Sequence, residues 1–165
     1  MTSGIFRKIM VATDGSELVK RAVEVAVEIA RLSEARLYAV HVIELEGNSI
    51  FHSINEEQKK ALREQLHIEG KKATDFVEDV GRTANVEVES IIIEGNPANV
   101  IIDLAEKNDI DLIVMGTQGK TGIERFLIGS VSENVIRHSK RAVLVVKGES
   151  ADLLFKALLN ERKTT

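Results

Sequence analysis

The stretch IMVATDGSELVKRAVEVAVEIARLSEARLYAVHVI, residues 9–43, decides the fold. It opens with a short apolar run that ends at Thr13-Asp14-Gly15-Ser16, a turn-rich strand exit. A second apolar run, residues 37–43, closes it. Between the two runs, apolar residues recur at helical spacing: Val19, Ala22, Val23, Ala26, Ile29 and Ala30. The stretch therefore predicts a strand, a helix and a second strand, which is one βαβ unit.

Three further apolar runs, residues 86–93, 112–115 and 142–146, repeat this alternation toward the C-terminus. In residues 86–93, valines alternate with glutamates before the run becomes apolar, which is typical of an edge strand. A long helix is expected before them, with Gly70 marking a bend or close packing and an inner face of Leu62, Leu66, Ala73, Phe76, Val77 and Val80. The pattern predicts a single α/β domain with a parallel sheet covered by helices on both faces.

Helix starts are marked by local signals. Ser16 is suited to cap the first helix, and Asn96-Pro97 supplies a cap followed by proline in the first turn. Ser130 and Glu133 have the spacing of a capping box. We therefore expect helices that begin just after each of these positions.

Composition narrows the possible functions. The 165 residues carry a net charge of −4, which opposes non-specific attraction to nucleic acid or anionic lipid, so no nucleic-acid or membrane partner is expected. No segment is apolar enough to predict a membrane span or a signal peptide, and a cytoplasmic location is expected. The absence of cysteine excludes disulfides and cysteine-ligated zinc.

The four histidines do not predict a metal centre. They lack short metal-ligand spacing, and each is expected at the surface or at a strand end: His41, His52, His67 and His138. We predict no protein-built metal site.

The segment GTQGKTG, residues 116–122, leaves the fourth apolar run, where an open parallel sheet places its ligand crevice. Its end imitates a Walker A loop, but that motif needs a glycine at the position of Val114. The dinucleotide fingerprint also fails, because the glycines at 116, 119 and 122 are not spaced as G-x-G-x-x-G. A standard P-loop and an NAD site are therefore excluded.

Gly129-Ser130 precedes the next predicted helix, whose first amides and macrodipole suit phosphate oxygens. Glycines at 116, 119 and 129 allow close backbone approach to a phosphate, and Lys120 and Arg125 add positive charge. The segment from Gly116 to Ser130 therefore predicts a phosphate cradle.

The spacing of these glycines resembles the ATP-binding branch of the universal stress protein family: Gly116, two residues, Gly119, nine residues, then Gly129-Ser130. The resemblance covers about residues 6–147 and includes Thr13-Asp14-Gly15-Ser16, His41-Val42 and the helix start at residues 132–135. It implies a Rossmann-like, adenine nucleotide alpha hydrolase-like three-layer sandwich, whose five-stranded parallel sheet has the order 3-2-1-4-5. The expected domain is 1–147, followed by a partly helical extension, 148–165.

The resemblance also implies a ligand and a partner. ATP is expected at the carboxyl ends of the strands, with Mg²⁺ accompanying its phosphates, and a homodimer is expected along the fifth strand, residues 142–146. The implied ATP-binding residues are Ala12, Thr13, Asp14, Val42, Met115, Gly116, Gly119, Gly129, Ser130, Val131 and Ser132.

Three functions remain open at this point. The first is an ATP-binding stress-response or signalling module, the second is a slow ATP hydrolase or phosphotransferase, and the third is a stress protein dimer without retained ATP. Thr117-Gln118 stands where many relatives have serine then histidine, which alters the side-chain hydrogen bonding without removing backbone contacts, so no contact of such a histidine is carried over to this chain. No residue is assigned a catalytic role, and Asp14 and Ser130 also fit plain capping roles.

Overall fold

The fold is built on one parallel sheet in the order β3-β2-β1-β4-β5, as predicted. The computed structural model of the chain describes residues 4–117 and 128–148. β1 lies at the centre, where Ile9 pairs with Leu37 on one side and with Leu112 on the other. The strands are β1 (Lys8–Ala12), β2 (Arg36–Ile43), β3 (Val88–Glu94), β4 (Leu112–Gly116) and β5 (Ala142–Val146).

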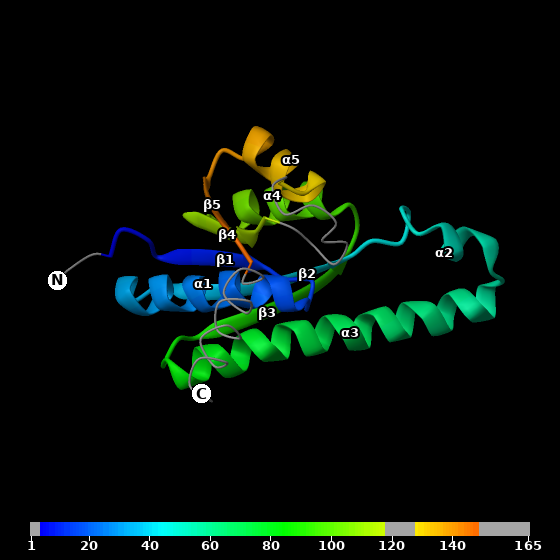
Figure 1. Ribbon diagram of the computed structural model, residues 1–165, viewed down its shortest axis with the longest axis horizontal. Coiled ribbons are helices and arrows are strands. Elements are labelled where there is room, and N and C mark those ends of the chain that lie inside the picture. The colour runs from blue at the N-terminus through cyan, green and yellow to red at the C-terminus, as the bar shows by residue number, and fades with distance from the viewer. Residues whose placement is uncertain (1–3, 118–127, 149–165) are drawn as a thin grey trace, which may run out of the picture.

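Helices cover both faces of the sheet and make three layers (Figure 1). Alternate strand residues point to opposite faces, so Ile9 and Val11 pack with α1 and α3, whereas Met10 packs with α4 and α5. The helical elements are η1 (Glu17–Val19), α1 (Lys20–Ser33), α2 (Ser49–Ser53), α3 (Glu56–Thr83), α4 (Pro97–Lys107) and α5 (Ser130–His138). Among the described residues, no helix combines the length and apolar character needed to cross a bilayer.

Of the three predicted helix caps, the structure confirms the one at Asn96 and shows that those at Ser16 and Ser130 are wrong. The Asn96 side chain accepts a hydrogen bond from the Asn99 amide, and Pro97 opens α4. Ser16 does not cap α1, because the short helix η1 intervenes and α1 begins at Lys20. The predicted capping box of Ser130 and Glu133 is also wrong, because Gly129 is the N-cap and Ser130 is already helical.

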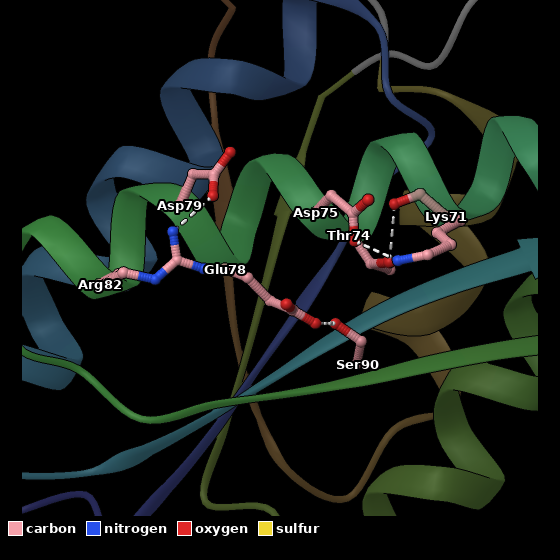
Figure 2. Close-up of polar contacts among 7 residues, drawn as sticks. All are labelled: Lys71, Thr74, Asp75, Glu78, Asp79, Arg82 and Ser90. Atoms are coloured by element: carbon pink, nitrogen blue, oxygen red, sulfur yellow. Dashed lines mark hydrogen bonds and ion pairs between the residues drawn. The ribbon is translucent and has the colours of Figure 1, made fainter.

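β3 is an edge strand, as predicted, but it begins at Val88 instead of Val86. The Val86 amide instead donates to the Gly81 carbonyl at the end of α3. α3 covers β3 in part through a polar contact, in which the Ser90 hydroxyl donates to the Glu78 carboxylate (Figure 2). The edge strand is thus held against α3 as well as against β2.

α3 has two halves with different surroundings. In the C-terminal half, small and apolar residues are buried against the sheet: Gly70, Ala73, Thr74, Val77 and Gly81. None of residues 56–69 is buried, and this half extends past the sheet (Figure 1). Leu62 and Leu66, expected on the inner face, are therefore only half-buried.

The amino edge of the sheet is closed by Asp111. Its Oδ2 accepts hydrogen bonds from the backbone amides of Arg7 and Lys8, at 2.8 and 2.9 Å. The Lys8 ammonium donates to the Asn108 carbonyl at 3.0 Å. Burial raises the pKa of the Asp111 carboxyl, but the two amide bonds outweigh it and hold the pKa below its ordinary value. Side-chain contacts thus fix the end of β1 where the chain enters the sheet.

Candidate functional site

A cavity of about 350 Å³ opens at the carboxyl ends of β1, β2 and β4. We call it the strand-end pocket. It contains the described residues that the sequence implied for ATP binding: Ala12, Thr13, Asp14, Val42, Met115, Gly116, Gly129, Ser130, Val131 and Ser132. Gly119 lies outside the described residues, as do Lys120 and Arg125. The structure therefore brings together the predicted residues from three strand ends and one helix start.

Five lining residues were missed by the sequence reasoning: Val19, Val40, Glu44, Pro97 and Ile101. Val40 has a local signal, because it lies two positions before Val42 and side chains of a strand share a face at that spacing. Pro97 and Ile101 are four positions apart on α4 and so face the same side of that helix. Their approach to the pocket depends on how α4 crosses the sheet, which no local pattern reveals.

One wall of the strand-end pocket is the β1 turn, residues 13–16. Two side chains fold back onto its backbone: Thr13 Oγ1 accepts from the Gly15 amide at 3.2 Å, and Asp14 Oδ1 accepts from the Ser16 amide at 2.9 Å. Gly15 adopts a φ of +75°, which favours glycine. Asp14 therefore stabilises its own turn, in line with the plain capping role considered for it.

Neighbouring strand β2 also holds the β1 turn. The Thr13 amide donates to the Val40 carbonyl at 2.9 Å, and the His41 ring is hydrogen bonded to the Thr13 carbonyl at 2.9 Å. His41 lies near the end of β2, as expected, but is buried and not at the surface. The Thr13 backbone is thus fixed on both its donor and its acceptor.

The opposite wall is the start of α5. Gly129 has extended φ and ψ angles and is the N-cap, so no cap side chain covers the first helical amides. The Ser132 hydroxyl, which is buried, donates to the Gly116 carbonyl at 2.8 Å and ties α5 to the end of β4. The Gly129 amide donates to the Thr117 carbonyl at 2.7 Å. These contacts place the N-terminus of α5 at the pocket.

The charged residues among the described lining are Asp14 and Glu44, both acidic. The positive end of α5 therefore supplies the attraction for an anion on this part of the pocket surface. Among the residues that the structure describes, no three histidine, aspartate or glutamate side chains are grouped to hold a metal ion. The described chemistry of the pocket is an apolar floor with backbone donors at one end.

Comparison with known proteins places this geometry in a family. Residues 5–147 match the model of the universal stress protein family. Universal stress protein MJ0531 of Methanocaldococcus jannaschii is 40% identical over 144 residues, which cover 87% of this chain and 83% of that protein. The family match thus spans every strand of the sheet, from β1 to β5.

Two solved structures are similar in fold. Hypothetical protein MJ0577 has a TM-score of 0.75 at 33% identity, over 87% of this chain and 96% of the other. A universal stress protein from Archaeoglobus fulgidus, solved in complex with dAMP, has a TM-score of 0.64 at 27% identity, over 87% and 99% of the two chains. Family model, sequence and fold agree, and the chain belongs to the universal stress protein family.

Proposed function

We propose that this protein is an ATP-binding stress-response or signalling module whose nucleotide state changes its conformation or its partners. The observation that carries the proposal is the start of α5 at the strand-end pocket. Ser130, Val131 and Ser132 line the cavity there, and Gly129 leaves their amides without a capping side chain. Such a helix start attracts phosphate through its free amides and its dipole.

The rest of the pocket suits a purine base. Val40, Val42 and Ile101 provide an apolar surface, with Pro97 at the start of α4 beside them. An adenine ring placed on this surface leaves its sugar and phosphates free to reach the amides of α5. A family member from Archaeoglobus fulgidus is described in complex with dAMP, which supports an adenine nucleotide as the ligand class.

Mg²⁺ is proposed to arrive with the nucleotide. A magnesium ion usually keeps several waters and binds phosphate oxygens of its substrate, so it needs few protein ligands. Bound there, it would neutralise phosphate charge near the acidic side chain of Asp14. The protein residues then orient the nucleotide, and no step of bond breaking is assigned to them.

We propose that the protein binds ATP and does not hydrolyse it as its function. Backbone amides at a helix start bind the phosphates of the ground state, and uniform binding of this kind does not accelerate a chemical step. The alternative of a slow ATP hydrolase is tested by phosphate release over hours from purified protein. Release that is abolished by Gly129→Asp would favour the hydrolase.

A homodimer along β5 is part of the proposal. β5 is an edge strand whose residues Val143, Leu144, Val145 and Val146 are only half-buried. An edge strand with such side chains is a surface for pairing with a second copy. Light scattering should give twice the chain mass of 18.2 kDa, and a mass of one chain at micromolar concentration would contradict the dimer.

The test of the nucleotide proposal is calorimetric titration of the protein with Mg-ATP. We expect saturable binding by the wild type and weaker binding by Gly116→Ala and Gly129→Ala, which add a side chain to the pocket lining. Asn85→Gly is a matched control, because Asn85 has a φ of 56° at the amino edge, where glycine fits. A wild type that binds no adenine nucleotide would defeat the proposal.

A further inference from the structure

The proposed nucleotide function does not use His41, a buried imidazole beneath the strand-end pocket. It belongs to β2, is only 8% exposed, and its Nδ1 lies 2.9 Å from the Thr13 carbonyl oxygen. A carbonyl oxygen only accepts hydrogen bonds, so Nδ1 carries the proton and donates. The contact therefore fixes the proton on that ring nitrogen and directs the Thr13 carbonyl toward β2.

The same contact orients the peptide between Thr13 and Asp14. In a trans peptide the C=O and the following N–H point in opposite directions, so the Asp14 amide points away from His41. Thr13 and Asp14 both line the strand-end pocket. The ring thus determines how this wall presents its backbone.

Helix α3 holds the ring from the other side through Gly70. A Cβ added at Gly70 would lie 2.7 Å from His41 Cδ2 and 3.3 Å from Nε2, and 3.2 Å from Ile92 of β3. Glycine in a helix interior is unfavourable by about 1 kcal/mol relative to alanine, so a packing requirement explains its presence. α3 can cover His41 only because residue 70 has no side chain.

A second contact of α3 reaches the β1 turn itself. A Cβ at Gly15 would lie 3.1 Å from the Ala73 side chain, which is on the buried face of α3 with Gly70. α3 therefore contacts the β1 turn in two ways: Ala73 contacts it directly, and Gly70, one helical turn away, contacts it through His41.

We propose that His41 is a positioning residue of the nucleotide pocket. Packed under Gly70, the His41 ring fixes the peptide between Thr13 and Asp14. The β1 turn therefore has its binding conformation before any ligand arrives. This inference rests on the proposed nucleotide function for its effect on binding, although its effect on the β1 turn does not require a ligand.

The experiment compares His41→Leu with His41→Asn. Asparagine carries its amide nitrogen on Cγ, as histidine carries Nδ1, and so keeps a donor for Thr13, whereas leucine has none. We expect Mg-ATP affinity to fall about tenfold in His41→Leu and to stay within about threefold of wild type in His41→Asn. Thermal melting of each variant identifies a temperature at which all are folded, and calorimetry is done there.

A ligand-free readout accompanies the titration. Amide hydrogen exchange of Thr13, Gly15 and Ser16 should be roughly tenfold faster in His41→Leu and close to wild type in His41→Asn. Loss of packing alone would affect His41→Asn at least as much as His41→Leu, because asparagine fills less of the buried site than leucine. Equal loss in both variants, or wild-type affinity and exchange in His41→Leu, would overturn the inference.

A second pair of variants leaves the histidine in place. Gly70→Ala pushes on the ring, whereas Gly81→Ala in the same helix crowds Val88 of β3, away from the pocket. We expect Gly70→Ala to weaken ATP binding several-fold and Gly81→Ala to leave it unchanged. The same ATP affinity in both would contradict the inference. A wild type without ATP binding would instead defeat the proposed function, and the exchange measurement would still decide whether His41 holds the turn.

Discussion

The two ends of the sheet use the same strands for different purposes. At the amino edge, Asp111 closes β1 by accepting hydrogen bonds from the amides of Arg7 and Lys8. At the carboxyl edge, the start of α5 is capped by a glycine and opens onto a cavity. A side chain satisfies the backbone donors at the start of β1, whereas the first amides of α5 have no capping side chain. The difference teaches that both edges hold stabilising contacts, but that at the carboxyl edge the first amides of α5 are left without a capping side chain beside a cavity.

The largest effect is expected from Gly129→Asp, which gives α5 the kind of cap that Asp111 gives β1. Aspartate is among the best N-cap residues, and its carboxylate would take the amides that a phosphate needs. ATP affinity should fall about 100-fold, or roughly 2.7 kcal/mol, while the urea midpoint stays the same or rises.

Gly129→Asn is the control for that variant, since asparagine caps without charge. Calorimetry should show a smaller loss of affinity for asparagine than for aspartate. Undiminished binding by Gly129→Asp would mean that the start of α5 is not where phosphate binds.

Asp111→Ala is the reverse experiment at the amino edge. It removes the acceptor of two backbone amides, and hydrogen bonds to a charged group contribute about 1.5–3 kcal/mol, so we expect a loss of about 2 kcal/mol in unfolding free energy. Urea denaturation measures the loss, and the Kd for ATP should change less than twofold. A large change in Kd would show that the two edges are not independent.

The contribution of Asp111 should also depend on pH. Its folded pKa lies below the ordinary value of 3.8, so its stabilisation is present above that value and disappears as pH falls through the lower folded pKa. The difference in unfolding free energy between wild type and Asp111→Ala should therefore be constant near neutral pH and shrink below about pH 4. A difference in unfolding free energy that does not shrink at all between neutral pH and about pH 2 would contradict a role for the charged form.

Ser132→Ala is expected to have the smallest effect, and it lowers both the unfolding free energy and the affinity for ATP. The Ser132 hydroxyl joins α5 to the Gly116 carbonyl at the pocket, so its removal should lower the unfolding free energy by about 1 kcal/mol. ATP affinity should fall about threefold, because the α5 start is less firmly placed. Ser139→Ala at the other end of α5 is the control, and an equal loss of affinity there would argue against a role in placement.

Much of the fold could be predicted because its signals are local. The central strands are short apolar runs, because parallel strands buried on two faces need apolar residues at every position, as in Ile9, Met10 and Val11. The 3-2-1-4-5 order came from the family resemblance and is confirmed. The pocket position followed from the strand exits, because ligands of open α/β sheets bind at the carboxyl ends of strands.

What could not be predicted depends on contacts between distant segments. The pocket contacts of Pro97 and Ile101 come from the crossing of α4 over the sheet. The capping box failed because Gly129, with extended backbone angles, is the N-cap one position before Ser130. Leu62 and Leu66 keep the helical period, but α3 has passed the end of the sheet there and nothing in their own sequence marks that end.

The fit between His41 and Gly70 has a consequence for the history of the sequence. Because a side chain at residue 70 would collide with the ring at residue 41, residue 70 is constrained to glycine as long as histidine stands at 41. A lineage that gains alanine at 70 gains helix propensity but must first shorten or turn the side chain at 41. Across descendants of this chain a side chain at 70 is expected only where residue 41 has changed, so that covariation of the two residues records the contact between α3 and β2.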